Sequence, residues 1–238
     1  MSFGTTTRCS ESIVLSTQKV KKLSTGEKMI LVSHMKTIPE LFRTILNGDK
    51  EVSRTAARAV RKTTYSANGG KYEDIKAIIN GASEKYRIII EEFRQENFVM
   101  AVSVMYFLHD REQDPDFIFP WLFHLLKHKN GNIRHCAVKM FWHELGPLTV
   151  HIRVQNWQSK SNRLSPKQLD KVLFDLYTGL EIMASEYFVP AYKKYKYVDS
   201  LPSGTYKSIQ MVLARMEEYC GEAILKNFRM YYTDIGIS

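Results

Sequence analysis

Cysteine, proline and glycine are scarce in this chain of 238 residues, which contains 3, 7 and 12 of them respectively. The cysteines, Cys9, Cys136 and Cys220, are far apart and odd in number, which excludes a disulfide scaffold and a cysteine-rich zinc site. The longest uncharged apolar stretch, from Phe98 to Leu108, has 11 residues and is too short to cross a membrane. The first residues are rich in Ser and Thr and lack the apolar core of a signal peptide. We therefore expect an intracellular protein, cytoplasmic or nuclear, with no membrane partner.

Signatures of catalysis are also missing. The chain has no Gly-x-Ser-x-Gly motif, no phosphate-binding glycine loop and no dinucleotide fingerprint. His124 and His128 are four residues apart and would share a helix face, as a metal pair does, but no third ligand is evident. We predict no catalytic residue, no metal and no cofactor, and an enzyme is the less favoured interpretation.

The few glycines and prolines leave long windows in which apolar residues recur at intervals of three and four. Ile38 to Leu46 is one such window, and Ser165-Pro166-Lys167-Gln168 is a strong helix start. No sustained two-residue alternation indicates a strand. We predict an all-α protein. The expected helices span about 38–46, 49–66, 73–80, 84–94, 98–110, 114–129, 133–145, 165–187, 206–219 and 221–231, with a polar loop over 151–164.

A faint internal repeat relates three of these helices. Val52-x-Arg54-x-Ala56-Ala57-x-x-Val60 aligns with Ile133-x-His135-x-Ala137-Val138-x-x-Phe141 at an offset of 81 residues, and Val99-x-Ala101-Val102-x-x-Met105 lies between them. Another apolar helix precedes each copy. Two helices every 36–45 residues is the period of helical solenoids.

Two stretches within this repeat resemble a known motif. They are Asp49-Lys-Glu-Val52-Ser-Arg54-Thr-Ala56-Ala57 and Asn130-Gly-Asn132-Ile133-Arg134-His-Cys-Ala137-Val138. Both resemble the second helix of HEAT-type repeats, in which a turn Asp or Asn, an aliphatic residue, an Arg and a small pair recur in this order. The resemblance covers roughly residues 34–146, and the middle copy lacks both the turn Asp and the Arg.

The resemblance implies stacked antiparallel helix pairs that form a short HEAT-like α-solenoid, with an irregular helical bundle as the alternative. In this organisation residues 1–33 are a Ser/Thr-rich, partly helical segment and residues 34–150 are the repeat region. Residues 151–238 are a helical region that continues the same domain.

Positive charge is segregated along the chain, whose net charge is +9. Residues 1–70 carry +7, residues 71–120 carry −4, residues 121–165 carry +6, and the remainder is neutral. In the aligned helices, cations lie roughly opposite the apolar stripe of Val52, Ala56 and Val60. These cations form a basic ridge on each of the two helices. On equivalent helices of a solenoid, two such ridges could line one surface and neutralise phosphates.

The 151–164 loop contains cations and Trp157 but no acidic residue, and irregular loops of this length are often functional. The run from Tyr192 to Tyr197 interleaves tyrosines with lysines, which suits an anionic surface or a packed helix end equally well. The predicted nucleic-acid-binding residues are Arg54, Arg58, Arg61, Lys62, His135, Lys139, His143, Arg153, Trp157, Lys160 and Arg163. Trp142, between Lys139 and His143, is more consistent with a packed aromatic.

These patterns favour a non-catalytic helical-repeat module that binds an acidic partner, either nucleic acid (DNA or RNA) or an acidic protein segment. A basic HEAT-like chain of this size is also similar in outline to the alkylpurine DNA glycosylases of bacteria, but no catalytic residue of that family has a match here. The other alternative is a protein–protein scaffold subunit of a larger assembly.

Overall fold

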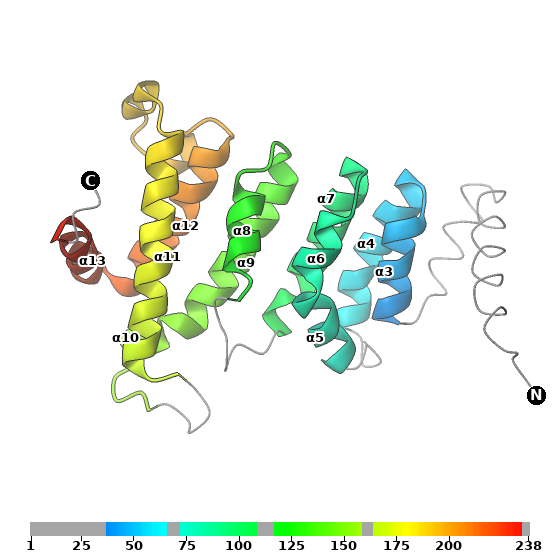
Figure 1. The fold of residues 1–238 in the computed structure, drawn as a ribbon, viewed down its shortest axis with the longest axis horizontal. Helices are drawn as coiled ribbons and strands as arrows, with labels where there is room; N and C mark the ends of the chain where they lie inside the picture. The colour runs from blue at the N-terminus through cyan, green and yellow to red at the C-terminus, as the bar shows by residue number, and fades with distance from the viewer. Residues whose placement is uncertain (1–36, 66–71, 109–116, 159–163, 235–238) are drawn as a thin grey trace, which may run out of the picture. The chain divides into compact units, whose positions relative to one another are not determined.

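The computed structural model describes residues 37–65, 72–108, 117–158 and 164–234, and these are all-α (Figure 1). The described residues form eleven α-helices and three short 3-10 helices, with no strand. Contacts divide the chain into two compact units. Of the described residues, the first contains those up to Ile78 together with Lys85–Met105, and the second contains Ile79–Glu84 and those from Tyr106 onward.

The helices follow one another along the chain with short connections. In and around the first unit they are α3 (Ile38–Asn47), α4 (Lys50–Thr64), α5 (Tyr72–Asn80), α6 (Ala82–Arg87) and α7 (Glu92–Met105). In the second unit they are η1 (Tyr106–Leu108), α8 (Phe119–Leu126), α9 (Gly131–Leu148), α10 (Val150–Arg153), α11 (Pro166–Tyr187), η2 (Pro190–Lys194), η3 (Val198–Ser200), α12 (Thr205–Cys220) and α13 (Glu222–Asp234).

A two-residue turn joins α3 and α4 into a helical hairpin. Asp49 begins α4 as its N-cap, and its carboxylate accepts from the Val52 N–H at 3.1 Å. Gly48, which follows α3, is extended rather than left-handed (φ −71°, ψ 162°). The Gly48 backbone lies so close to the preceding turn of α3 that a side chain would not fit, since an added Cβ would lie 2.7 Å from the Thr44 carbonyl oxygen.

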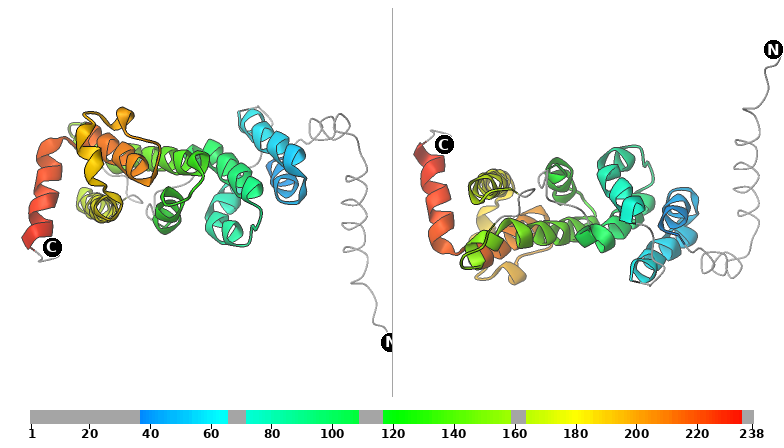
Figure 2. Two further views of the ribbon diagram at one scale, coloured as in Figure 1. Left: turned by 90° about the horizontal axis from the view of Figure 1, so that it is seen from above. Right: turned by 90° about the horizontal axis from the view of Figure 1, so that it is seen from below.

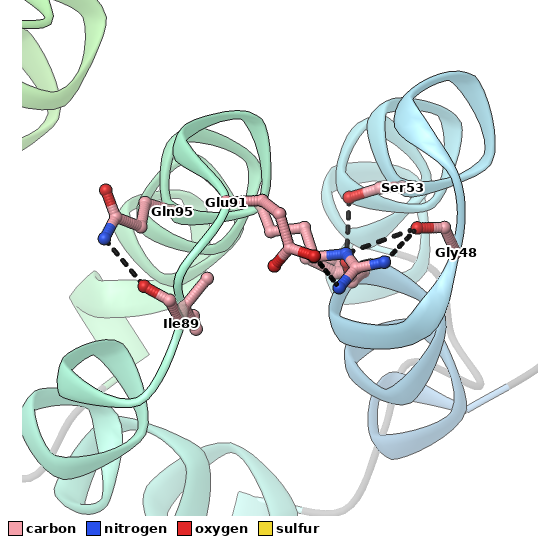
Figure 3. Close-up of polar contacts among 7 residues, drawn as sticks. Gly48, Ser53, Ile89, Glu91 and Gln95 are labelled. Carbon is pink, nitrogen blue, oxygen red and sulfur yellow. Dashed lines mark hydrogen bonds and ion pairs between the residues drawn. The ribbon is translucent and has the colours of Figure 1, made fainter.

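Helices α4 and α7 pack against each other, and this interface joins the two sequence segments of the first unit. The Asn97 amide donates to the Ser53 hydroxyl at 3.0 Å (Figure 3). Ser53 in turn donates to the Ile45 carbonyl at 2.8 Å. Both side chains are buried, and the chain of hydrogen bonds satisfies them. Nearby, the Arg94 guanidinium donates to the Gly48 carbonyl at 3.1 and 3.3 Å and to Glu91 at 2.8 Å. These contacts fix the α3–α4 turn against the start of α7.

The expected single helix over 84–94 is wrong. Helix α6 ends at Arg87 and α7 begins at Glu92, so Ile88, Ile89 and Ile90 lie in an irregular connection. Three consecutive β-branched residues have a low helix propensity, and the break leaves the Ile89 carbonyl free to accept from the Gln95 amide at 2.7 Å (Figure 3). The break also changes which isoleucines are buried, because Ile89 is buried whereas Ile88 and Ile90 are exposed.

The second unit is built from two neighbouring helix pairs, α8 with α9 and α11 with α12. Helices α9 and α12 contact each other, and the two views of Figure 2 show α8 and α11 in one layer and α9 and α12 in the other. Aromatic rings fill the α8–α9 interface, where Phe119 and Phe123 each meet Phe141 with ring centroids 5.6 and 5.5 Å apart. Helix α13 follows and packs on α11 and α12.

Two sequence expectations in the second unit need correction. Helix α9 does not stop at Gly146-Pro147 but continues to Leu148, and the Thr149 N–H closes its last turn on the Leu145 carbonyl at 3.1 Å. Proline is tolerated near this helix end because the chain turns there into α10. Residues 150–153, expected within an irregular loop, are that short helix. The predicted start of α11 is confirmed, since Gln168 accepts from the Ser165 N–H at 2.9 Å.

Candidate nucleic-acid interface

Four of the predicted binding residues form a row on α4. Arg54, Arg58, Arg61 and Lys62 are all exposed. They alternate with Val52, Ser53, Ala56, Ala57 and Val60, which are buried on the opposite face. The predicted amphipathic arrangement of α4 is therefore confirmed. We call these four residues the α4 basic row.

Among the residues that the structure describes, no carboxylate pairs with the α4 basic row. None of its four side chains forms an ion pair with a residue that the structure describes. Helix α4 itself contains a single acidic residue, Glu51, in its first turn. Arg61 and Lys62 lie in the last turn, where cations also complement the helix dipole. The row therefore presents a positive surface to solvent.

The predicted residues of α9 make a weaker cationic surface. His135, Lys139 and His143 are exposed, as expected for one helix face. Partial burial and the neighbouring Lys139 charge lower the pKa of His135, which leaves this imidazole neutral at pH 7. The His143 ring contacts Phe107, with centroids 6.2 Å apart. Only Lys139 therefore supplies a fixed positive charge on this helix face.

Trp142 packs between helices rather than facing a ligand. It is half-buried, and its indole N–H donates to the Met211 carbonyl of α12 at 3.3 Å. The Arg215 guanidinium covers its ring at 4.7 Å. This confirms the interpretation of Trp142 as a packed aromatic.

Arg153 has a structural position at the α9–α10 bend. It donates to the Thr149 hydroxyl at 3.0 Å and to the Gly146 carbonyl at 2.8 Å, and its guanidinium stacks on Tyr219 at 4.6 Å. Trp157 is half-buried beside His151, whose Nε2 lies 2.8 Å from the Asp170 carboxylate. Lys160 and Arg163 lie outside the described residues. Of this predicted loop cluster, Arg153 is exposed but holds the bend through its hydrogen bonds, and Trp157 is half-buried.

One arrangement in the second unit was not predicted from the sequence. Arg215 lies between Trp142 and Tyr219, at 4.7 and 5.3 Å from their ring centroids, and Tyr219 in turn supports Arg153. The four residues come from α9, α10 and α12, and α12 is far from the other two helices along the sequence. No local spacing signals such a contact, because cation–π pairs depend on the packing of distant helices.

The lysine and tyrosine run of residues 192–197 lies at the 3-10 helix η2 and the residues after it. Tyr192 stacks on Tyr206 of α12 with centroids 5.0 Å apart, which anchors the run to the second unit. Lys193, Lys194 and Lys196 are exposed. The packed-tyrosine interpretation is confirmed for Tyr192, whereas Tyr197 is 65% exposed.

The two predicted basic ridges belong to different units, the α4 basic row to the first and the α9 residues to the second. Their convergence on one surface therefore stays a prediction. Within the described parts of the chain, no three His, Cys, Asp or Glu side chains gather to hold a metal ion. No helix there is both long and apolar enough to cross a membrane.

Comparison of the chain with protein-family models, with curated proteins and with solved structures finds no match. A functional assignment therefore depends on the geometry and charge of the described residues.

Proposed function

We propose that the chain is a non-catalytic module of HEAT-like helical repeats that binds nucleic acid through the α4 basic row. The single observation that supports this proposal most is the exposure of four cations on one helix face, none paired with a described carboxylate. The helix pairs α3–α4, α8–α9 and α11–α12 are the kind of unit that helical-repeat proteins stack.

The dimensions of the row suit a phosphate backbone. The eight residue steps from Arg54 to Lys62 span about 12 Å at 1.5 Å per residue. A duplex strand carries one phosphate per ~3.4 Å of axis, so that the row matches three to four phosphates. Arginine is well suited to the task because its guanidinium donates two parallel hydrogen bonds to phosphate oxygens. Such contacts hold the backbone and carry no sequence information, so we expect binding without strong sequence preference.

The decisive experiment replaces the four cations of the α4 basic row by glutamine, a neutral residue of similar helix propensity. We would measure the affinity of the chain and of the variant R54Q/R58Q/R61Q/K62Q for 20-nucleotide single strands and duplexes of DNA and RNA by fluorescence anisotropy. We expect the variant to bind at least tenfold more weakly at low salt, because it lacks the four cations that pair with phosphates.

A matched control changes the net charge by the same amount at other sites. Lys127, Lys167, Lys171 and Lys226 are exposed residues of the second unit, and their replacement by Gln should change the affinity by less than threefold. Equal weakening in both variants would show a general charge effect and contradict the assignment to α4. An absence of binding by the unmodified chain at low salt would contradict nucleic-acid binding itself.

A further inference from the structure

The break between α6 and α7 creates a groove in the first unit, of about 580 Å³. Helix α3 supplies one wall through Phe42 and Leu46, and Ile88 and Ile89 of the connection supply the other. Ile78 of α5 also lines it. The apolar lining is therefore mainly aliphatic, and Ile88 is 69% exposed although it is one of the most apolar residues of the chain. This groove is independent of the α4 basic row, because it shares no residue with it.

The rim of the groove is positive. Arg43 and Lys85 stand on it and form no ion pair with any residue that the structure describes. Arg94 and Glu91 also line it but neutralise each other at 2.8 Å. Among the described residues, the unpaired charges of the groove are therefore both cations.

The charge and the surface chemistry together restrict the occupant. The segment of residues 1–36 carries six basic and two acidic side chains, so that its charge has the same sign as the rim. Nucleobases bind to aromatic faces, but the one aromatic lining residue, Phe42, is buried against Phe98 at 5.6 Å in an edge-on contact. An aliphatic floor with a cationic rim fits apolar side chains flanked by carboxylates.

We propose that this groove is a docking site for a short acidic segment of a partner protein that carries one or two large apolar side chains. The apolar side chains enter between α3 and Ile88, where they cover an exposed apolar surface. The flanking Asp or Glu residues pair with Arg43 and Lys85 at the rim. Because the rim is polar and the floor apolar, the site has the arrangement of a small protein interface.

The chain offers a matched pair of variants to test the site. Ile88 lines the groove, whereas Ile90, two residues later and 91% exposed, does not. Both side chains are exposed, so replacement by Asp should leave folding unchanged, which circular dichroism and thermal unfolding would verify. Ile88→Asp places a negative charge in the groove and removes the apolar side chain of Ile88 from its wall. Ile90→Asp makes the same chemical change outside the groove.

The experiment begins with a displayed library of random dodecapeptides that is selected on the full chain and counter-selected on the Ile88→Asp variant. We expect the recovered peptides to be enriched in Asp and Glu together with Leu, Ile, Phe or Trp. The most enriched peptide, synthesised with a fluorophore, should bind at least tenfold more weakly to Ile88→Asp and at least fivefold more weakly to R43E/K85E, and equally well to Ile90→Asp.

Three results would overturn the proposal: no peptide that depends on Ile88, recovery of basic peptides, or equally weakened binding to Ile90→Asp. The proposal would also be overturned if the unmodified chain bound no peptide and Ile88→Asp bound oligonucleotides more weakly. That result would assign the groove to nucleic acid. The outcome is independent of the nucleic-acid assay on the α4 basic row, so either proposal can fail alone.

Discussion

At the scale of single residues, the neighbours of an arginine decide whether its charge is available to a ligand. Arg134 is only 7% exposed and donates to the carbonyls of His128 and Lys129 at 2.7 and 2.9 Å. Arg153 and Arg215 stack on aromatic rings. Arg54 and Arg58 face solvent. The basic residues of the sequence thus divide into those that stabilise turns and bends and those that can meet a partner.

We predict that Arg134→Ala lowers the free energy of unfolding by roughly 2–3 kcal/mol, because it leaves two turn carbonyls without a charged donor. The change also removes the hydrogen bond to the Ser203 hydroxyl at 3.3 Å. Urea unfolding followed by circular dichroism measures the effect. Arg54→Ala is the control and should change the stability by less than about 0.5 kcal/mol. Equal stabilities of the two variants would contradict a structural role for Arg134.

Burial also sets the chemistry of Cys220. Desolvation, with a smaller contribution from Asp170, raises the pKa of its thiol to about 11. The folded state thus binds the proton more tightly than the unfolded state. This contribution to stability is complete below about pH 9 and is lost as the pH rises towards 11.

The raised pKa makes the Cys220 thiol unreactive in the native protein. At pH 8.5 we expect iodoacetamide to modify Cys220 at least a hundredfold more slowly in the folded chain than in urea, because the nucleophile is the thiolate. Peptide mass spectrometry reads the modification at this residue directly. A native rate within a few-fold of the unfolded rate would show that the thiol is ionised or accessible, contrary to its burial.

At the scale of elements, periodicity and caps predicted most helices correctly, and the errors have local physical causes. The start of α11 was predicted from side-chain chemistry that acts within four residues. The break at Ile88 was missed because an apolar run fits a buried helix equally well. The passage of α9 through Gly146-Pro147 was missed because the contacts of Arg153 with that turn depend on α10.

Two glycines of the second unit provide contrasting predictions. Gly146 lies within α9 directly before Pro147, and apart from its chain neighbours an added Cβ would meet nothing within 4 Å. Gly146→Ala should change the stability by less than about 0.5 kcal/mol, because the gain in helix propensity is offset by the proline ring, which disfavours a helical residue with a Cβ before it. Gly221 ends α12 with φ +80°, a conformation that strains every other residue. Gly221→Ala should destabilise the protein by about 1–3 kcal/mol, although its Cβ would also meet open space.

Thermal unfolding of the two variants tests this pair, and each serves as the control of the other. Both replacements add one methyl group that meets no atom within 4 Å outside the neighbouring residues of the chain, so tertiary packing cannot explain a difference in size. An equal destabilisation of both variants would contradict the assigned backbone conformations.

At the scale of the whole molecule, the charge pattern was predicted from the sequence but its grouping in space was not. The +7 and +6 blocks are a property of the sequence, and the exposed row on α4 follows from its helical period. The ring contacts of Arg153 and Arg215 could not be recognised, because their partners Tyr219 and Trp142 come from distant helices. The division into two units also arises from long-range contacts that local patterns do not specify.

The salt dependence of nucleic-acid binding tests the central claim most directly, because each cation that pairs with a phosphate releases a counterion. For a 20-base-pair DNA duplex, we predict that R54Q/R58Q/R61Q/K62Q makes the slope of log K against log salt concentration shallower by roughly three to four, at ~0.9 for each cation removed. The four-lysine control variant should keep the slope of the unmodified chain. An unchanged slope in the α4 variant would contradict the claim that this row binds phosphates.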